Sequence, residues 1–318
     1  MSAPALSWEL IRAARERLAG RVHRTPVLTS ARLDAHTGAQ LYFKAEMLQK
    51  AGTFKARGAT NAVFALAGAE AARGVVTHSS GNHAAALARA AALRGIPAHV
   101  VMPHTASHVK RAAAERYGAH IHLCEPTMAD RERTAAEVLA ATGGTLIHPY
   151  DDALVMAGQG TAAWELLEEV GTLDALVCPV GGGGLVSGSA VAAQTLQPGI
   201  QVFGVEPAGA DDAVRSLRAG RILPSEQPRT IADGLRSSLG VQPFAIIRER
   251  LADILTVSDE AIVAAMRELW EVLKVLVEPS AAVPYAAVRN GLPALKGRRV
   301  GIILSGGNLD LEQLPWQR

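Results

Sequence analysis

Four consecutive glycines, Gly181 to Gly184, stand between an apolar run that predicts a strand and a run that predicts a helix. Without β-carbons, their backbone N–H groups can approach an anion closely, and the N-terminus of the following helix adds a favourable potential. The pattern predicts a phosphate-binding loop. A Walker loop is excluded because no Lys-Ser or Lys-Thr pair follows the glycines.

Glu206 opens a competing interpretation of this loop. It closes the next predicted strand, about 20 residues downstream, where dinucleotide-binding folds place the acid that binds a ribose. The G-x-G-x-x-G pattern, however, is not satisfied in any register of Gly181 to Gly184. A nucleotide-binding oxidoreductase therefore remains the alternative function, and a tight turn with a purely structural role remains the alternative for the loop itself.

Two further segments carry chemically useful side chains. Lys55 lies in a sharp, glycine-bounded turn over residues 52–58 that leads into a predicted helix. A lysine there is usually a solvated charge, but one that is desolvated near other cations loses its proton more readily and can form a Schiff base. Residues 79–83, Ser-Ser-Gly-Asn-His, open another helix, so they can bind a carboxylate or simply cap that helix.

The elements that must position these residues follow an alternating order. Strand-sized apolar runs alternate with Ala-rich, helix-sized runs, which is typical of βαβ units around a mainly parallel sheet. The clearest are strands over 74–77, 98–102, 119–123, 175–180, 201–205 and 299–304, and helices over 84–93, 107–117 and 130–141. Because ligands bind beyond the carboxyl ends of such strands, we expect the loops at 79–83, 181–184 and 305–308 to converge on one cleft.

The composition excludes several classes of protein. The 318 residues are enough for two lobes, and no apolar run approaches the roughly 20 residues that a membrane-spanning helix needs. The net charge of +2, without blocks of like charge, argues against nucleic acid or a membrane as partner. The charged N-terminal segment does not resemble a secretory signal. We expect a soluble, cytoplasmic protein with a small-molecule partner.

We expect no catalytic or metal-binding role for the two cysteines or for His120 and His122. Cys124 and Cys178 end apolar runs without metal-type spacing, so buried free thiols are expected, as suits a reducing compartment. His120 and His122 would share one face of a predicted strand and could form half a metal site. No third ligand is evident beside them, so a surface role is favoured.

Taken together, the motifs have a familiar order. Residues 52–59, 79–83, 181–185 and 305–308 occur in the order seen in fold type II pyridoxal-phosphate enzymes, and the chain resembles their serine/threonine dehydratase and serine racemase family from about residue 20 to 312. The resemblance implies an α/β, tryptophan-synthase-β-like fold: two three-layer αβα domains with mainly parallel, twisted sheets. A large cofactor-binding domain would comprise residues 1–65 and 152–318, and a small substrate-gating domain residues 66–151. A homodimer is implied too.

The same resemblance implies a role for each motif. The activity would be a dehydratase (ammonia-lyase) or racemase reaction, or both, on serine, threonine or a related β-hydroxy amino acid. Lys55 would hold pyridoxal 5'-phosphate and take the α-proton, and Ser80 would be the acid/base on the opposite face. The implied cofactor-binding residues are Phe54, Lys55, Asn82, Gly181, Gly182, Gly183, Gly184 and Ser305. The implied substrate-binding residues are Ser79, Ser80, Asn82, His83, Arg131 and Ser237, with an exposed helix charge the equal alternative for Arg131.

The resemblance also implies a divalent-cation site. Residues 206–212 resemble the divalent-cation loop of the racemases, in which Glu206, Asp212 and the carbonyl of Ala210 would bind Mg²⁺, or else Ca²⁺ or Mn²⁺. Without the resemblance an acidic surface turn would be preferred. Ala85 stands where racemases have a glutamine at a nucleotide-binding interface, which weighs against nucleotide activation. A ligand-sensing protein without catalytic activity is the third interpretation, but ligand sensing alone would not require both Lys55 and Ser80.

Overall fold

Two sheets organise the chain in the computed structural model, which describes residues 5–79, 81–106 and 108–317. Within these residues, a six-stranded sheet has the order β1-β2-β10-β7-β8-β9, and a four-stranded sheet has the order β5-β4-β3-β6. Strand β1 runs antiparallel to β2, whereas the other neighbouring strands pair in parallel. The expected α/β fold with mainly parallel sheets is confirmed.

The elements have the following bounds. The strands are β1 (Val27–Leu28), β2 (Gln40–Ala45), β3 (Val75–His78), β4 (Ala98–Pro103), β5 (His120–Cys124), β6 (Thr145–Leu146), β7 (Ala175–Pro179), β8 (Gln201–Pro207), β9 (Asp253–Val257) and β10 (Arg299–Leu304). The helices are α1 (Trp8–Leu18), α2 (Ala31–Thr37), α3 (Lys55–Ala65), α4 (Gly68–Ala72), α5 (Asn82–Arg94), α6 (His108–Glu115), α7 (Met128–Thr142), α8 (Ala153–Val170), α9 (Gly184–Leu196), α10 (Asp212–Ala219), α11 (Val241–Arg250), α12 (Asp259–Leu273) and α13 (Pro279–Arg289). Short 3₁₀ helices occur at η1 (Glu46–Leu48), η2 (Lys50–Gly52), η3 (Asp233–Leu235) and η4 (Pro293–Leu295).

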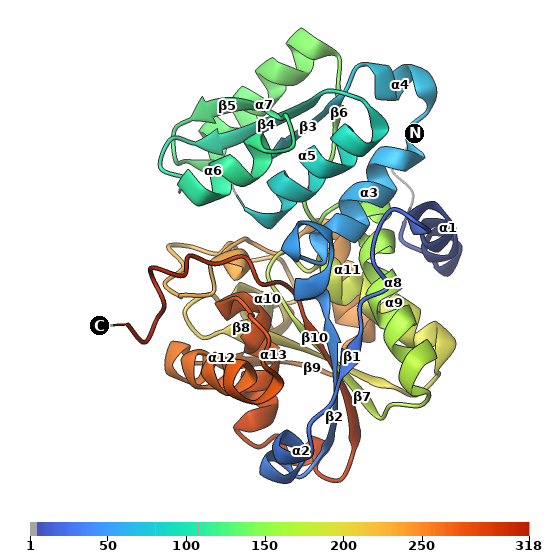
Figure 1. The fold of residues 1–318 in the computed structure, drawn as a ribbon, viewed down its shortest axis with the longest axis vertical. Helices are drawn as coiled ribbons and strands as arrows, with labels where there is room; N and C mark the ends of the chain where they lie inside the picture. The colour runs from blue at the N-terminus through green and yellow to red at the C-terminus, as the bar shows by residue number, and fades with distance from the viewer. Residues whose placement is uncertain (1–4, 80, 107, 318) are drawn as a thin grey trace.

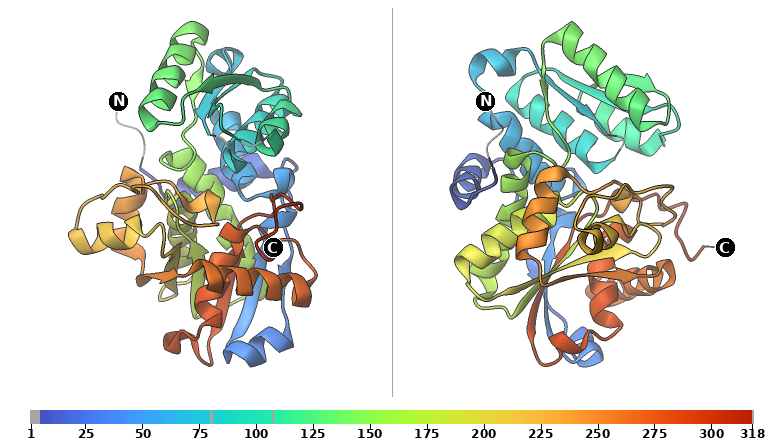
Figure 2. Two further views of the ribbon diagram at one scale, coloured as in Figure 1. Left: turned by 90° about the vertical axis from the view of Figure 1, so that its left-hand side faces the viewer. Right: turned by 180° about the vertical axis from the view of Figure 1, so that it is seen from behind.

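The large sheet is covered on both faces. Successive residues of β7 enter opposite cores: Val177 packs with α12 and α13, whereas Leu176 packs with α1, α8 and α9. A strand buried on both sides carries apolar residues at every position, and β7 is buried throughout. Figures 1 and 2 show the resulting helix, sheet and helix layers.

The small sheet is built in the same way. Val100 of β4 packs with α5 and α6, and its neighbour Val101 packs with α7 on the opposite face. Figure 1 shows this four-stranded sheet above the six-stranded one, with α3 between them. The four strands come from residues 75–146, but the domain limits at 65/66 and 151/152 stay a prediction.

Two smaller expectations can be compared with the structure. Cys124 and Cys178 are free and buried, as predicted. Among the helices that the structure describes, none is both long enough and apolar enough to cross a membrane.

Candidate active site

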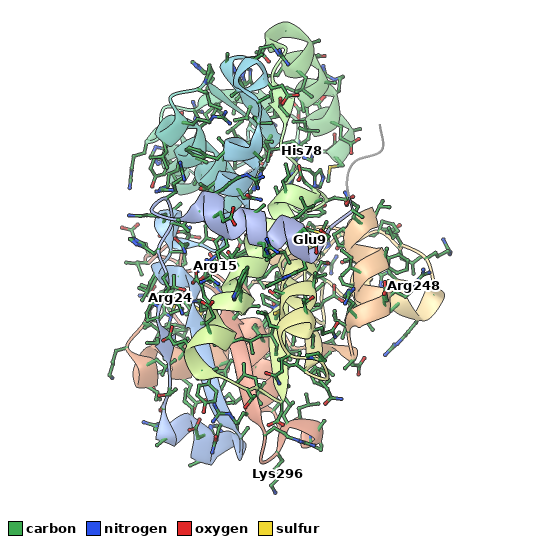
Figure 3. All side chains as sticks on the ribbon, turned by 90° about the vertical axis from the view of Figure 1, so that its right-hand side faces the viewer. Glu9, Arg15, Arg24, His78, Arg248 and Lys296 are labelled. Carbon is green, nitrogen blue, oxygen red and sulfur yellow. The ribbon has the colours of Figure 1, made fainter. Side chains whose placement is uncertain are left out.

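A cavity of about 400 Å³ lies where the two sheets face each other. Strand β3 leads into Ser79, β7 leads into Gly181 and β10 leads into Ser305, and all three residues line the cavity. Figure 3 shows His78, the last residue of β3, at the junction between the two halves of the molecule. The predicted convergence of three strand ends on one cleft is confirmed.

Lys55 begins α3 and lines this cavity. Its Nζ donates a hydrogen bond to the carbonyl oxygen of Pro149 at 2.7 Å, and it lies 5.1 Å from the ring centroid of Phe54. Desolvation in the cavity lowers the pKa of Lys55 to about 8. A neutral amine, which is the nucleophilic and basic form of lysine, is therefore much more accessible here than on a solvated surface.

A buried ionic network anchors the first turn of α3. Arg57 is fully buried, and its guanidinium donates to both oxygens of Glu46 and to both oxygens of Glu165 at 2.7 to 2.8 Å. Lys44 completes the network with a 2.8 Å ion pair to Glu165. Two cations and two carboxylates balance each other, which offsets the cost of removing their charges from water. The network fixes Arg57, and with it the turn that carries Lys55.

The tetraglycine loop has no room for side chains. Gly183 has a φ of +86°, a left-handed conformation that favours glycine. A β-carbon on Gly182 would lie 2.2 Å from Cγ of Tyr150, and one on Gly184 would lie 2.9 Å from the Tyr150 carbonyl oxygen. Because α9 begins at Gly184, its first N–H groups have no partner within the helix. The loop is therefore a buried cradle of backbone donors that suits an anion.

Asn82 joins the two halves of the molecule beside the cavity. Its Nδ2 donates to Oε1 of Glu278 at 2.9 Å, and its Oδ1 accepts from Nδ2 of Asn308 at 2.9 Å. The backbone N–H of Asn308 in turn donates to Oε2 of Glu278 at 3.2 Å. An amide NH₂ group has two donors, and hydrogen bonds to the described residues use one of those of Asn82, which leaves the other for a bound molecule.

The expected substrate-binding residues lie around the same cavity. Ser79, Asn82, His83, Arg131 and Ser237 all line it, whereas Ser80 lies outside the described residues. Nδ1 of His83 and Nε of Arg131 are buried and have no hydrogen-bond partner within the described part of the chain. Desolvation and the charge of Lys55 lower the pKa of His83 well below its usual value, so its imidazole is neutral. Both atoms are available to a ligand.

The lining fits a phosphorylated aldehyde. Phe54, Lys55, Asn82, Ser305 and the four glycines, all expected to bind pyridoxal phosphate, line the cavity. Ser305 is buried, and its carbonyl oxygen accepts from the N–H of Phe54 at 3.0 Å, which ties the end of β10 to the turn before Lys55. One amine, one anion cradle and one aromatic face are the parts that such a ligand requires.

Glu206 and Asp212 lie apart from the cavity lining and are fully buried. Oδ2 of Asp212 accepts from the N–H of Leu239 at 2.9 Å, but its Oδ1 has no hydrogen-bond partner among the described residues. Desolvation and neighbouring carboxylates raise the pKa of Glu206 to about 8, and desolvation raises that of Asp212 to about 6. A hard cation would relieve both costs, so the donor set fits Mg²⁺ or Ca²⁺.

The structure contradicts the oxidoreductase interpretation of Glu206. Its two carboxylate oxygens accept from the N–H groups of Ala213 and Val214, at 3.1 and 3.0 Å, at the start of α10. Glu206, in β8, is therefore buried against the start of α10 and does not line the glycine cavity, where a ribose would lie. Although Glu206 follows the glycines at the spacing of a ribose-binding acid, its carboxylate binds N–H groups at the start of α10 instead.

Several cavity residues were missed by sequence reasoning. Tyr150 packs on the glycine loop, the carbonyl of Pro149 accepts from Lys55, and Glu278 accepts from Asn82. Asn308 lies in a loop that was expected at the cleft, but its hydrogen bond to Asn82 was not predicted. Nothing in the local sequence of Glu278 indicates a partner 196 residues away. These contacts depend on the packing of the two sheets, which local patterns do not report.

Comparisons with known proteins agree with this geometry. A family model described as pyridoxal-phosphate dependent enzyme matches residues 18–306. The chain is 50% identical over 310 residues to β-hydroxyaspartate dehydratase from Paracoccus denitrificans, covering 98% of each chain, and 48% identical to serine racemase from Arabidopsis thaliana, covering 96% of this chain and 93% of the relative. The structure of maize serine racemase superposes with a TM-score of 0.95 at 46% identity, covering 97% of this chain and 95% of that one.

Proposed function

The chain belongs to the pyridoxal-phosphate-dependent enzymes of fold type II, and on that premise we propose that it takes the α-proton from a small β-hydroxy amino acid and then eliminates water, racemises the substrate, or does both. The observation that carries the proposal is that Lys55 and the buried tetraglycine line one cavity, although more than a hundred residues separate them. The names of the relatives, a dehydratase and racemases, support the same class of reaction.

Each cavity residue then has a defined task in holding the cofactor. Gly181 to Gly184 would bind its phosphate through backbone N–H groups, Lys55 would hold its aldehyde carbon, and Asn82 would donate to its ring hydroxyl. Phe54 would pack against the ring, and Ser305 would face the ring nitrogen with a neutral hydroxyl. When bound, pyridoxal phosphate supplies an electron sink for the charge left on the substrate's α-carbon.

Proton transfer is the task of Lys55 and Ser80. The amine of Lys55 would take the α-proton from one face, which its lowered pKa favours near neutral pH. Return of a proton by Ser80 from the opposite face inverts the α-carbon. Loss of the β-hydroxyl instead gives an elimination product that takes up water and yields a keto acid and ammonia. Both outcomes share the first proton transfer.

The polar groups at the start of α5 would bind the substrate's α-carboxylate. Ser79, Asn82 and His83 surround this helix N-terminus, where backbone N–H groups attract an anion. Arg131 would bind a second carboxylate, because its Nε is buried without a partner in the described residues. This assignment favours 3-hydroxyaspartate among the possible substrates, with serine and threonine as weaker ones. Ser237 would contact the same ligand.

Two further features belong to the proposal. Glu206, Asp212 and the carbonyl of Ala210 would bind Mg²⁺, with Ca²⁺ or Mn²⁺ as substitutes, and the unpartnered Oδ1 of Asp212 supports this set. The cation would act on stability and on the arrangement of α10, since its ligands do not line the cavity. The resemblance to racemases further supports a homodimer, which light scattering of the purified enzyme tests.

A product assay tests the proposed function. Purified enzyme is given L-serine, D-serine, L-threonine and 3-hydroxyaspartate, and keto acid and enantiomer are scored together. We expect keto acid from the L-substrates, with the highest kcat/KM for 3-hydroxyaspartate. Ser80→Ala should suppress interconversion of the serine enantiomers and spare elimination from L-substrates. No keto acid and no inversion with any of the four would refute the proposal.

A further inference from the structure

We propose that His99 and His122 form a binding site for a divalent transition-metal ion on the small sheet, separate from the active site. Nδ1 of His99 and Nε2 of His122 lie 3.1 Å apart. Neither residue lines the cavity, and neither belongs to the proposed magnesium site. The two imidazoles therefore have no part in the chemistry described above.

The register of two strands brings these histidines together. Strands β4 and β5 run in parallel, with His99 opposite His120 and Val101 opposite His122. Because alternate residues of a strand share a face, all three imidazoles project from the same side of the sheet. The ring of His99 stacks on that of His120 at 5.0 Å between centroids and lies 5.3 Å from that of His122. His99 therefore lies beside the two histidines that share one face of β5, a neighbour that the sequence analysis did not identify.

The spacing of the two nitrogens suits one bound ion. With metal–nitrogen bonds of about 2.0 to 2.1 Å, donors 3.1 Å apart subtend about 100° at the metal. That angle lies between about 90° for square-planar or octahedral sites and about 109° for tetrahedral ones, so Cu²⁺, Ni²⁺ and Zn²⁺ are all accommodated. The ion would replace the proton that the two rings share, leaving His99 protonated on Nε2 and His122 on Nδ1.

The surroundings favour imidazole as a ligand. Burial, and then the neighbouring histidines, lower the pKa of His99, while burial and His120 lower that of His122, so both rings are neutral at neutral pH. In the described residues, no three His, Cys, Asp or Glu side chains are already gathered as a metal site. The site is therefore a two-imidazole chelate whose remaining ligands would be water.

An ion bound to His99 and His122 would link two neighbouring strands at the edge of the small sheet. Strand β5 is at the edge of the small sheet, and Figure 1 shows it at the outer border of that half. His99 and His120 stand near the beginnings of their strands, whereas the active-site cavity lies beyond the ends. An ion bound to both strands cross-links the edge strand to its neighbour. It therefore stabilises the small sheet without entering the active site.

Equilibrium dialysis of the holoenzyme against Ni²⁺ tests the site, with any affinity tag removed and with Mg²⁺ saturating the proposed carboxylate site. Wild type should bind Ni²⁺, and His99→Gln and His122→Gln should each weaken binding by about tenfold or more. His23→Gln, a change at an exposed histidine of the other half, is the matched control and should bind as wild type does. Equal binding by all four proteins would overturn the proposal.

A second measurement on wild type does not depend on how the variants fold. Cu²⁺ added at one equivalent per chain should give an electron paramagnetic resonance spectrum with coupling to imidazole nitrogen. Ni²⁺ should also raise the Tm of wild type and of His23→Gln, but not that of the two site variants. A Cu²⁺ spectrum without nitrogen coupling would contradict the assignment.

Discussion

Gly182 and Tyr150 are in such close contact that a β-carbon on the glycine would lie 2.2 Å from Cγ of the tyrosine ring. Tyr150 follows Pro149, whose carbonyl accepts the hydrogen bond from Lys55, so one short segment contacts both Lys55 and the glycine loop. Desolvation raises the pKa of Tyr150 to about 12, and the phenol therefore stays neutral. The ring is a fixed wall behind the glycine cradle.

Gly182→Ala should displace this wall. We expect the enzyme to lose cofactor affinity by more than about tenfold and to lose about 1 to 3 kcal/mol of unfolding free energy, because an added methyl group must push the ring and the loop apart. Absorbance titration with cofactor and urea unfolding measure the two effects. Gly68→Ala is the control, since no atom lies within 4 Å of its β-carbon position. Unchanged affinity in Gly182→Ala would show that the loop does not hold the cofactor.

Recapture of the cofactor should depend on the ionisation of Lys55. The ammonium form of Lys55 cannot attack an aldehyde. The rate at which the apoprotein binds the cofactor should therefore rise about tenfold per pH unit below the Lys55 pKa of about 8, and should level off above that pH. Stopped-flow absorbance at several pH values gives the profile. A free lysine derivative, with a pKa near 10.4, is the reference and should keep rising beyond pH 8. A protein profile that follows the reference would mean that the cavity does not desolvate Lys55.

Arg131→Ala should discriminate between substrates. A charge-assisted hydrogen bond contributes about 1.5 to 3 kcal/mol, so kcat/KM for 3-hydroxyaspartate should fall about 10- to 150-fold, with a much smaller loss for L-serine. Arg133→Ala, on the same helix, removes an exposed arginine paired with Asp130 and Glu137, and should change neither value. Equal losses for the two substrates would place Arg131 on the carboxylate that they share.

Divalent cations should stabilise the protein through Asp212. Mg²⁺ at a hundred times its Kd should add about 2.7 kcal/mol to the unfolding free energy of wild type and raise its Tm. The increase should vanish in Asp212→Asn, which removes the charge next to the unpartnered oxygen, and persist in Asp211→Asn, whose exposed carboxylate pairs with Arg215. Thermal scans with and without chelator measure it. A wild-type Tm that Mg²⁺ does not change would contradict the proposed cation site.

The sequence was informative where function resides in contiguous motifs. The glycines at 181–184 and the loop at Ser305 each combine unusual composition with a strand end, and strands of a parallel sheet end at a common edge. The turn at Lys55 instead combines two glycines with the start of a helix. Predicted strand 299–304 has the observed bounds, whereas predicted helix 84–93 begins at Asn82 and ends at Arg94. Helix ends depend on caps and packing, which periodicity reports only coarsely.

The parts that escaped prediction are contacts between distant segments. Tyr150 behind Gly182, and Glu278 beside Asn82, follow from how the two sheets face each other. His99 escaped for a related reason, because the register of β4 against β5 decides which side chain lies opposite His120. Register is a tertiary property that neither strand encodes alone.

The central claim, that the amine of Lys55 holds an aldehyde whose phosphate lies in the glycine cradle, is tested most directly by the visible absorbance of Lys55→Ala after reconstitution with pyridoxal phosphate. Lys296→Ala is the matched control, since Figure 3 shows Lys296 at the far end of the molecule from His78. We predict that Lys55→Ala lacks the long-wavelength band of a lysine-bound cofactor and has no turnover, whereas Lys296→Ala keeps both. A yellow, active Lys55→Ala enzyme would contradict the account.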